Sequence, residues 1–265
     1  TKCYALFKFT GYLFGKLGKT DGEDYGYGTV DNPNWDAINP YWSTIANDIA
    51  SYKNGTLSED DFIEKYPIGG RMIIPVNLSS GTVTADLEII GHHDDLADGS
   101  GKSPITFFCV DLPNIKKPID DPTDDDNWAD CDIRVFTNGE LFDAFPEELK
   151  AIIQSVSKIS DGGLNNQTLV TTEEKVWLAS YDEVGFTNSN FALLGQGTIY
   201  EDIFSTDNSS RIKYITDSTS QGGWWLRSSY RSDNSSTLFV QVTKSGSSYG
   251  YFPYSALYVA FGFCI

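Results

Sequence analysis

Apolar residues first recur with a helical period between residues 42 and 49. Trp42, Ile45, Ala46 and Ile49 fall on one face of a helix, and the Asn-Pro pair at residues 39–40 suits its N-cap and first position. Gly55 follows the last of these apolar positions and is the expected stop. The pattern predicts an amphipathic helix.

A β-hairpin is predicted next along the chain. Residues 71–78 and 82–90 are rich in β-branched side chains, and Ser79-Ser80-Gly81 separates the two runs. Residues 91–95 then leave the sheet, and the short apolar run at residues 105–110 predicts a further strand.

Two more helices are predicted in the middle of the chain. Residues 128–138 have the pattern of a helix that Gly139 ends, and Pro146-Glu147-Glu148 suits the start of another. The apolar face of the second helix consists of Leu149, Ile152, Ile153 and Val156. We expect both helices to pack on the sheet.

Strands dominate the rest of the sequence. Residues 176–179 form an apolar run, and three further strand-like runs lie at residues 224–227, 238–243 and 258–263. Loops rich in Ser, Gly and Asn join the last three runs. Helices and strands in this arrangement predict an α+β domain.

The chain length fits one large domain with an N-terminal extension. At 265 residues the chain is long enough to bury a sizeable core. Residues 11–33 are rich in Gly, Asp and Tyr and show no sustained period. We therefore expect an arm or adaptor at residues 1–34 and a globular domain at residues 35–265.

The charge of the chain narrows its range of partners. A formal net charge of −18 and a pI near 4.3 give a negative field that repels nucleic-acid phosphates and anionic lipid head groups. No apolar run reaches the roughly 20 residues that span a bilayer, so no membrane insertion is expected. The sequence starts at Thr1 rather than Met, which leaves room for an upstream segment.

The cysteines, histidines and aspartates do not form a recognisable metal site. Cys3, Cys109, Cys131 and Cys264 are far apart, so we expect buried free thiols, with one disulfide as the alternative. His92 and His93 are adjacent to Asp94 and Asp95, but neighbouring side chains of an extended segment point to opposite faces. We expect a structural role at the strand end. The acidic run at residues 120–126 lacks the calcium-loop pattern of an EF-hand and is expected to be a solvated loop.

No catalytic motif was found in a suitable context. The patterns G-x-S-x-G, H-E-x-x-H, the P-loop and G-x-G-x-x-G are missing from strand-to-helix positions. With two adjacent histidines, a Ser-His-Asp triad is also disfavoured. We expect neither a catalytic site nor a cofactor.

The C-terminal segment has the composition of a contact surface. From Tyr249 to Phe263, seven of fifteen residues are Tyr or Phe, interleaved with Gly, Ser, Pro and Ala. Tyr with Ser and Gly is typical of antibody paratopes, because it supplies large contact area at low entropic cost. A β-rich core end is the alternative, but it accounts poorly for a Tyr-rich run with almost no aliphatic residues.

The same segment carries a coding signature. Randomising the two adenines of an Asn codon that ends in a pyrimidine never yields Lys, Glu, Gln, Met or Trp. Residues 245–265 contain none of these five types, although they are frequent elsewhere in the chain. This absence agrees with randomisation of Asn codons in the segment.

An ordered series of short motifs resembles the variable proteins of diversity-generating retroelements. The resemblance is centred on Gly223-Trp224-Trp225-Leu226-Arg227-Ser228 and closes with Gly262-Phe263-Cys264. Earlier motifs of the series are Gly70-Arg71, Gly91-His92-His93-Asp94, the stretch at residues 101–107, Trp128-Ala129-Asp130-Cys131-Asp132-Ile133-Arg134, Leu149-Lys150, Thr171-Thr172-Glu173-Glu174-Lys175 and Arg211-Ile212-Lys213. The resemblance covers about residues 35–265.

The resemblance implies a fold and a set of varied positions. The fold would be C-type-lectin-like, related to the formylglycine-generating enzymes, with short antiparallel strands, two or three helices, long loops and a variable region at residues 224–265. The implied ligand-binding, variable positions are Ser229, Tyr230, Ser232, Asp233, Ser235, Ser236, Leu238, Ser248, Tyr249, Tyr251, Phe252, Tyr254, Leu257 and Tyr258. The implied fixed scaffold is Trp224, Trp225, Leu226, Arg227, Val240, Val242, Gly262 and Phe263.

The expected function is therefore ligand binding at a host or cell surface. The resemblance implies a receptor-binding protein of a phage virion or a bacterial cell surface, with a protein or other surface ligand and a possible homo-oligomer. Ser229 departs from the family, in which Pro is frequent at this position, and the calcium-dependent sugar motif of lectins is missing. The alternatives are a non-varying structural module of a phage particle and a formylglycine-generating-type oxidoreductase.

Overall fold

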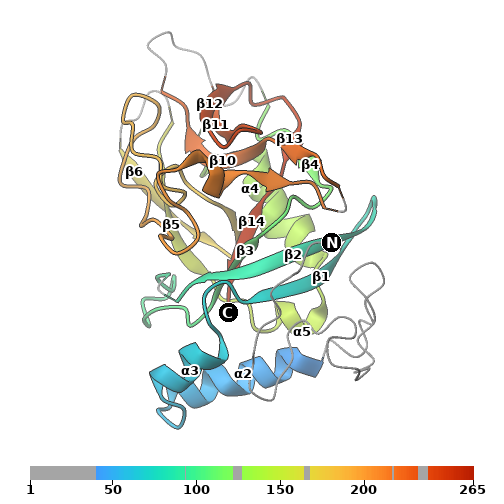
Figure 1. The fold of residues 1–265 in the computed structure, drawn as a ribbon, viewed down its shortest axis with the longest axis vertical. Coiled ribbons are helices and arrows are strands. Elements are labelled where there is room, and N and C mark those ends of the chain that lie inside the picture. Colours follow the sequence, from blue (N-terminus) through green and yellow to red (C-terminus); the bar gives the residue numbers. More distant parts are fainter. Residues whose placement is uncertain (1–39, 93, 122–126, 164–167, 217, 232–237) are drawn as a thin grey trace.

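The computed structural model describes residues 40–92, 94–121, 127–163, 168–216, 218–231 and 238–265. The arm expected at residues 1–34, and the domain boundary with it, lie outside these ranges. The described part is an α+β domain with mostly antiparallel sheets and few helices (Figure 1).

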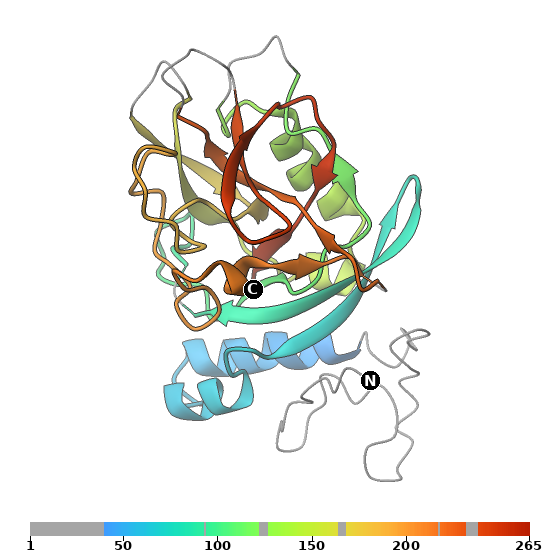
Figure 2. The same cartoon turned by 45° about the horizontal axis from the view of Figure 1, so that its top comes forward.

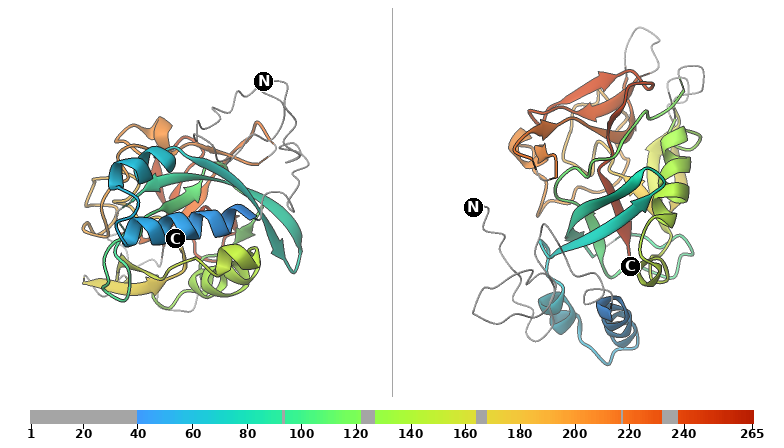
Figure 3. Two further views of the ribbon diagram at one scale, coloured as in Figure 1. Left: turned by 90° about the horizontal axis from the view of Figure 1, so that it is seen from below. Right: turned by 90° about the vertical axis from the view of Figure 1, so that its right-hand side faces the viewer.

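The first predicted helix is confirmed as α2 (Pro40–Lys53). Trp42, Ile45 and Ile49 are buried, and Gly55 follows with a φ of 77°. A short helix that the sequence reading missed, α3 (Glu59–Lys65), begins after Ser58, whose hydroxyl accepts from the Asp61 amide at 3.2 Å. Both helices lie beneath the first hairpin, at the end of the domain opposite β11 and β12 (Figure 3).

The predicted hairpin is confirmed and forms one side of the first sheet. Strands β1 (Arg71–Leu78) and β2 (Gly81–Gly91) pair antiparallel, and the turn closes at Leu78 opposite Gly81. The sheet continues through β3 (Thr106–Cys109), β14 (Phe261–Cys264) and β7 (Val176–Leu178), all antiparallel. The C-terminal strand therefore lies inside this sheet, between two strands from earlier in the chain.

The second sheet carries the C-terminal segment. Its strand order is β12 (Ser248–Tyr251), β11 (Phe239–Val242), β10 (Trp224–Ser229), β13 (Leu257–Tyr258) and β4 (Lys116–Lys117). Only the β10–β13 pair of this sheet is parallel. Figure 2 brings this sheet toward the viewer.

The single strand predicted at residues 258–263 is wrong. The chain forms β13 in the second sheet, passes through the buried Val259 and Ala260, and enters β14 in the first sheet. The Val259 amide donates to the Ile115 carbonyl at 3.0 Å, outside either ladder. An apolar run that is buried throughout gives no sequence signal of this change of partner.

The helix predicted at residues 128–138 is shifted in the structure. It begins as α4 (Asp132–Phe136) and continues through the π-helical turn η1 (Thr137–Leu141), so Gly139 does not end it. Trp128 lies in the preceding turn, where its Nε1 donates to Glu174 Oε1 at 2.9 Å. The Asn138 side chain also donates to Glu174, at 2.5 Å, and this contact holds the far end of the helix.

The helix predicted from Pro146 is also much shorter than expected. Helix α5 (Glu147–Lys150) is a single turn, and Val156 begins strand β5 (Val156–Asp161). The Gln154 amide donates to the Cys264 carbonyl at 2.9 Å. The chain after α5 therefore pairs with the C-terminal strand instead of continuing as a helix. Strand β5 pairs with β6 (Leu169–Glu174), and the remaining small sheet is β8 (Lys213–Tyr214) with β9 (Gln221–Gly222).

The core is rich in aromatic residues and includes three cysteines. Cys109, Cys131 and Cys264 are buried free thiols, as expected, and Cys3 lies outside the described residues. Burial raises the pKa of the Cys109 thiol to about 12 and raises the pKa of the other two as well. In the described ranges, no helix is both long and apolar enough to cross a membrane.

Candidate binding surface

Strand β10 is the central strand of the second sheet, and all of its residues are buried. Trp224, Trp225, Leu226 and Arg227 are fully buried, and Trp224 lies opposite Val242 in the ladder. The indole N–H of Trp224 donates to the Arg211 carbonyl at 3.2 Å, and that of Trp225 to the Lys117 carbonyl at 3.0 Å. All the residues expected to form the scaffold are buried: Trp224, Trp225, Leu226, Arg227, Val240, Val242, Gly262 and Phe263.

Arg227 connects β10 to the rest of the domain through every N–H that its guanidinium carries. Two of these N–H groups donate to Glu183, at 2.6 and 2.9 Å. The other three bonds go to backbone carbonyls of Ile159, Leu178 and Gln196, at 3.0, 2.7 and 2.8 Å. A fully buried arginine with five bonds holds the strand in one register, and lysine cannot reproduce this geometry.

Glu183 also belongs to a buried ionic cluster that the sequence reading missed. Lys158 donates to Asp94, to Glu183 at 3.2 Å and to the Tyr200 hydroxyl at 2.9 Å. The Tyr200 hydroxyl in turn donates to Asp94 at 2.8 Å. Lys158 also lies over the ring of Trp177, 3.7 Å from its centroid. The members are 17 to 106 residues apart in the chain, so no local pattern could reveal them.

The pKa values of the cluster follow from this geometry. Burial alone would raise the pKa of Asp94, but the charge and hydrogen bond of Lys158, with bonds from Thr106 and Tyr200, lower it to about 2. The pKa of Glu183 is also lowered, because Arg227 and Lys158 outweigh the effect of burial. Both carboxylates are therefore ionised at neutral pH.

Acid is expected to weaken the fold through Asp94. Its folded pKa lies below the ordinary value of 3.8, so the stabilisation is present above that value and is lost as the pH falls toward 2. Urea unfolding between about pH 5 and pH 2 should show a decline to which Asp94 contributes on the order of 2 kcal/mol. The Asp94→Asn variant should have a flatter profile, and an identical slope in both proteins would contradict the assignment.

Beyond the buried scaffold, aromatic side chains reach the solvent. Tyr249 on β12 is 60% exposed, and Phe252 and Tyr254 in the following turn are 51% and 54% exposed. The rings of Phe252 and Tyr254 are stacked, with centroids 5.4 Å apart. The ring of Tyr251 contacts a buried ring and an exposed one. Its centroid lies 6.2 Å from that of the Trp225 ring and 6.5 Å from that of the Phe252 ring. We call Tyr249, Tyr251, Phe252 and Tyr254 the aromatic surface.

A second aromatic pair borders strand β12. Tyr230 stacks on Phe191 with ring centroids 5.7 Å apart. A Cβ atom at Gly250 would lie 2.4 Å from the Tyr230 ring, so glycine is needed there for the ring to pack on the strand. Tyr230 is half-buried as a result.

The structure divides the fourteen implied variable positions by exposure. Exposed positions are Tyr249, Phe252 and Tyr254, and half-buried ones are Tyr230, Leu238, Ser248, Tyr251 and Leu257. Positions outside the described residues are Ser232, Asp233, Ser235 and Ser236.

Two of the implied variable positions are buried. Ser229 is 3% exposed, and its amide donates to Asp161 Oδ2 at 3.0 Å. Tyr258 is 9% exposed, and Lys116 lies over its ring, 4.4 Å from the centroid. Little of either residue is exposed to solvent.

The histidine and aspartate clusters have structural contacts in the described residues. His92 Nδ1 lies 2.5 Å from the Pro104 carbonyl, and Asp95 pairs with Lys102 at 2.6 Å, while His93 is outside the described ranges. In the acidic run that was expected to be a solvated loop, Asp121 is exposed and residues 122–126 lie outside the described ranges. Asp120 departs from that expectation, because it is buried and its Oδ1 accepts from the Asp132 amide at 3.2 Å. Among the described residues, no group of three or more His, Cys, Asp and Glu is placed to hold a metal ion.

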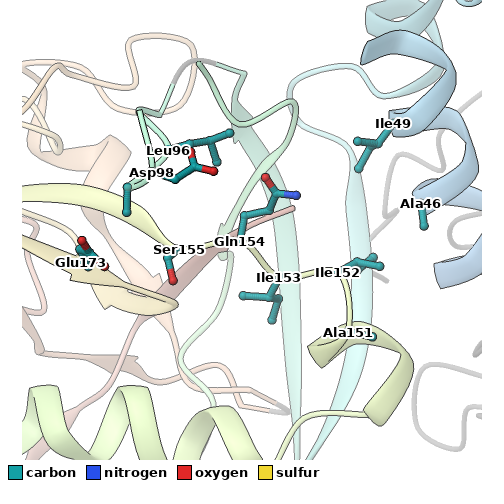
Figure 4. A pocket seen from close by; sticks show the side chains of 11 residues that line it. Ala46, Ile49, Leu96, Asp98, Ala151, Ile152, Ile153, Gln154, Ser155 and Glu173 are labelled. Atoms are coloured by element: carbon teal, nitrogen blue, oxygen red, sulfur yellow. The ribbon is translucent and has the colours of Figure 1, made fainter. Parts of the chain in front are cut away.

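Two hollows lie away from the aromatic surface. One of about 570 Å³ is bordered by Ala46 and Ile49 of α2 and by the segment at residues 151–155 (Figure 4). The other, of about 170 Å³, opens beside Lys158 and Tyr200. The sequence reading gave no sign of either, because each combines segments that are distant in the chain.

Comparison with known proteins assigns a family without an activity. The family model described as "Domain of unknown function (DUF6273)" matches residues 109–259, from the end of β3 to the segment after β13. No curated protein matches the chain, and no solved structure matches it. Because the match spans more than half of the sequence, the chain belongs to the DUF6273 family.

Proposed function

We propose that this protein is a diversified ligand-binding protein, the variable protein of a diversity-generating retroelement, with a C-type-lectin-like fold. Its C-terminal aromatic surface would recognise a molecule on a host or cell surface. The short antiparallel strands, few helices and long connections of the domain support that fold.

One observation carries the proposal. The exposed rings of Tyr249, Phe252 and Tyr254 lie on edge strand β12 and the turn after it, in a sheet whose central strand is buried at every residue. Side chains on such a base can change without loss of the core, because their contribution to folding is small compared with that of the strands beneath. Large, rigid aromatic rings at the surface are also what binding hot spots use.

The chemistry of the cysteines favours binding over the oxidoreductase alternative. The reactive form of cysteine is the thiolate, and burial raises the pKa of Cys109, Cys131 and Cys264. At neutral pH these three residues are protonated thiols in the core. They are therefore poorly suited to the thiol-dependent chemistry of the formylglycine-generating enzymes.

The DNA that neighbours the gene tests the proposal. A reverse-transcriptase gene and a near-copy of the segment that encodes residues 224–265 are expected there. Differences between the two copies should fall at adenines of the template, in codons such as those of Tyr249, Phe252 and Tyr254. A neighbourhood without any near-copy would overturn the proposal and favour a fixed structural module of a phage particle.

A further inference from the structure

The turn that carries the two stacked rings is bonded directly to an acidic part of the chain. The Pro253 carbonyl, between Phe252 and Tyr254, accepts from the amides of Ile119 and Asp120 at 2.9 and 3.3 Å. The Asp120 side chain accepts from the Asp132 amide at 3.2 Å. The exposed rings and the start of α4 therefore belong to one corner of the domain.

The described residues of this corner carry negative charge. Residues 118–121 and 127–133 include Asp120, Asp121, Asp130 and Asp132 and neither lysine nor arginine. In the described part of that stretch, Asp121, Asp130 and Asp132 are exposed. The nearest following cation, Arg134, pairs with the buried Glu174 at 2.6 Å, so its charge is compensated.

Lys116 and Lys117, which precede the acidic stretch in the sequence, contact other rings. Lys116 lies over Tyr258 and Lys117 over Phe136, each 4.4 Å from the ring centroid. Within the described ranges, no lysine or arginine lies over Phe252 or Tyr254. Two stacked, exposed rings beside carboxylates thus form a site where a cation is attracted by the ring faces and by the aspartates together.

We infer that the aromatic surface takes a protein partner that presents arginine or lysine side chains at the Phe252–Tyr254 corner. The inference rests on the proposed binding function and specifies the chemistry of its partner. The partner's cation packs on the exposed ring faces and lies opposite Asp121 and Asp132. The net charge of −18 adds a long-range field that steers a basic partner and repels anionic lipids and nucleic acids.

Selection of peptides on the full chain tests this inference. A displayed library of short random peptides would be selected on the immobilised wild-type protein and, separately, on the Phe252→Ser/Tyr254→Ser variant. Peptides specific to the wild type should be enriched in arginine and lysine. Both rings are about half exposed, so the variant is expected to fold, and its thermal unfolding would verify this.

The best selected peptide then provides a quantitative readout. Its affinity should fall about tenfold on the Phe252→Ser/Tyr254→Ser variant and about threefold on Asp121→Asn, with weaker salt dependence in the latter. The Tyr214→Ser variant is the control, because Tyr214 is a 37% exposed tyrosine on β8 and its loss should leave the affinity unchanged.

Three results would overturn the inference: no enrichment on the wild type, enrichment of peptides without basic residues, or full affinity on the double variant. These outcomes are separate from failure of the proposed function. If a neighbouring template copy exists but the selected peptides are neutral, the proposed diversification stands and the inference of a basic partner is overturned. If the peptides are basic but no template copy exists, the basic partner stands and the proposed diversification is overturned.

Discussion

Replacing Lys158 with alanine is expected to lower the free energy of unfolding by about 3–5 kcal/mol. Lys158 is 2% exposed and bonds to Asp94, Glu183 and Tyr200. Without its ammonium group, Asp94 would be a buried carboxylate without an opposite charge in contact. Urea unfolding monitored by tryptophan fluorescence measures the change.

An exposed ion pair serves as the control for this experiment. Lys102 pairs with Asp95 at 2.6 Å, but the two side chains are 56% and 69% exposed, so Lys102→Ala should cost less than about 1 kcal/mol. The Lys158→Ala/Asp94→Asn variant should lose less than the sum of its single variants, because the second change removes the unpaired charge. Equal losses for Lys158→Ala and Lys102→Ala would contradict the role of the cluster.

Replacing Gly246 with alanine is expected to destabilise the protein by about 3 kcal/mol or more, from steric overlap and a strained backbone. Gly246 has a φ of 80°, and a Cβ atom there would lie 1.9 Å from the Asn208 carbonyl oxygen. Its own carbonyl accepts from Arg211 Nε at 3.0 Å. The residue closes the turn between β11 and β12, so the change should also disturb the strand that carries Tyr249.

A Gly55→Ala variant distinguishes the effect of steric overlap from the effect of backbone strain. It has a similar φ of 77°, but a Cβ atom there would meet nothing within 4 Å. Gly55→Ala should therefore cost only the backbone strain, about 1–2 kcal/mol. Thermal unfolding of both variants measures the difference, and similar losses would show that the contact with Asn208 has little effect.

The first hairpin and the first helix were predicted well. The β1–β2 hairpin and helix α2 follow from local periodicity and from Gly55 and Gly81 at their ends. The single turn of α5 and the shift of α4 could not be predicted, because both depend on distant partners. Gln154 bonds to Cys264, and Trp128 and Asn138 bond to Glu174.

The sequence predicted which segment carries the candidate surface, but only partly which of its residues are exposed. The Tyr-rich run identified Tyr249, Phe252 and Tyr254, which are exposed. The same run contains Tyr258, which is buried, because a tyrosine gives no indication of which sheet face it occupies when the strand changes partner. The buried ionic cluster around Lys158 could not be predicted from the sequence, since a lysine in a strand such as β5 is ordinarily solvated.

The cluster and the aromatic surface meet in strand β10. Arg227 bonds to Glu183 at one end of this connection, and the Trp225 ring packs against Tyr251 at the other. On the proposed function, a buried strand between the ionic cluster and the exposed rings would let the outer residues vary while the fold is kept. This division of roles is the central claim of the proposed function.

Deep sequencing of the gene from one propagated population tests that claim most directly. Codons for the exposed Tyr249, Phe252 and Tyr254 should differ between individual copies, while codons for the buried Trp224, Val240 and Val242 should be constant. Substitutions that are absent, or that fall equally on exposed and buried codons, would contradict a diversified surface on a fixed scaffold.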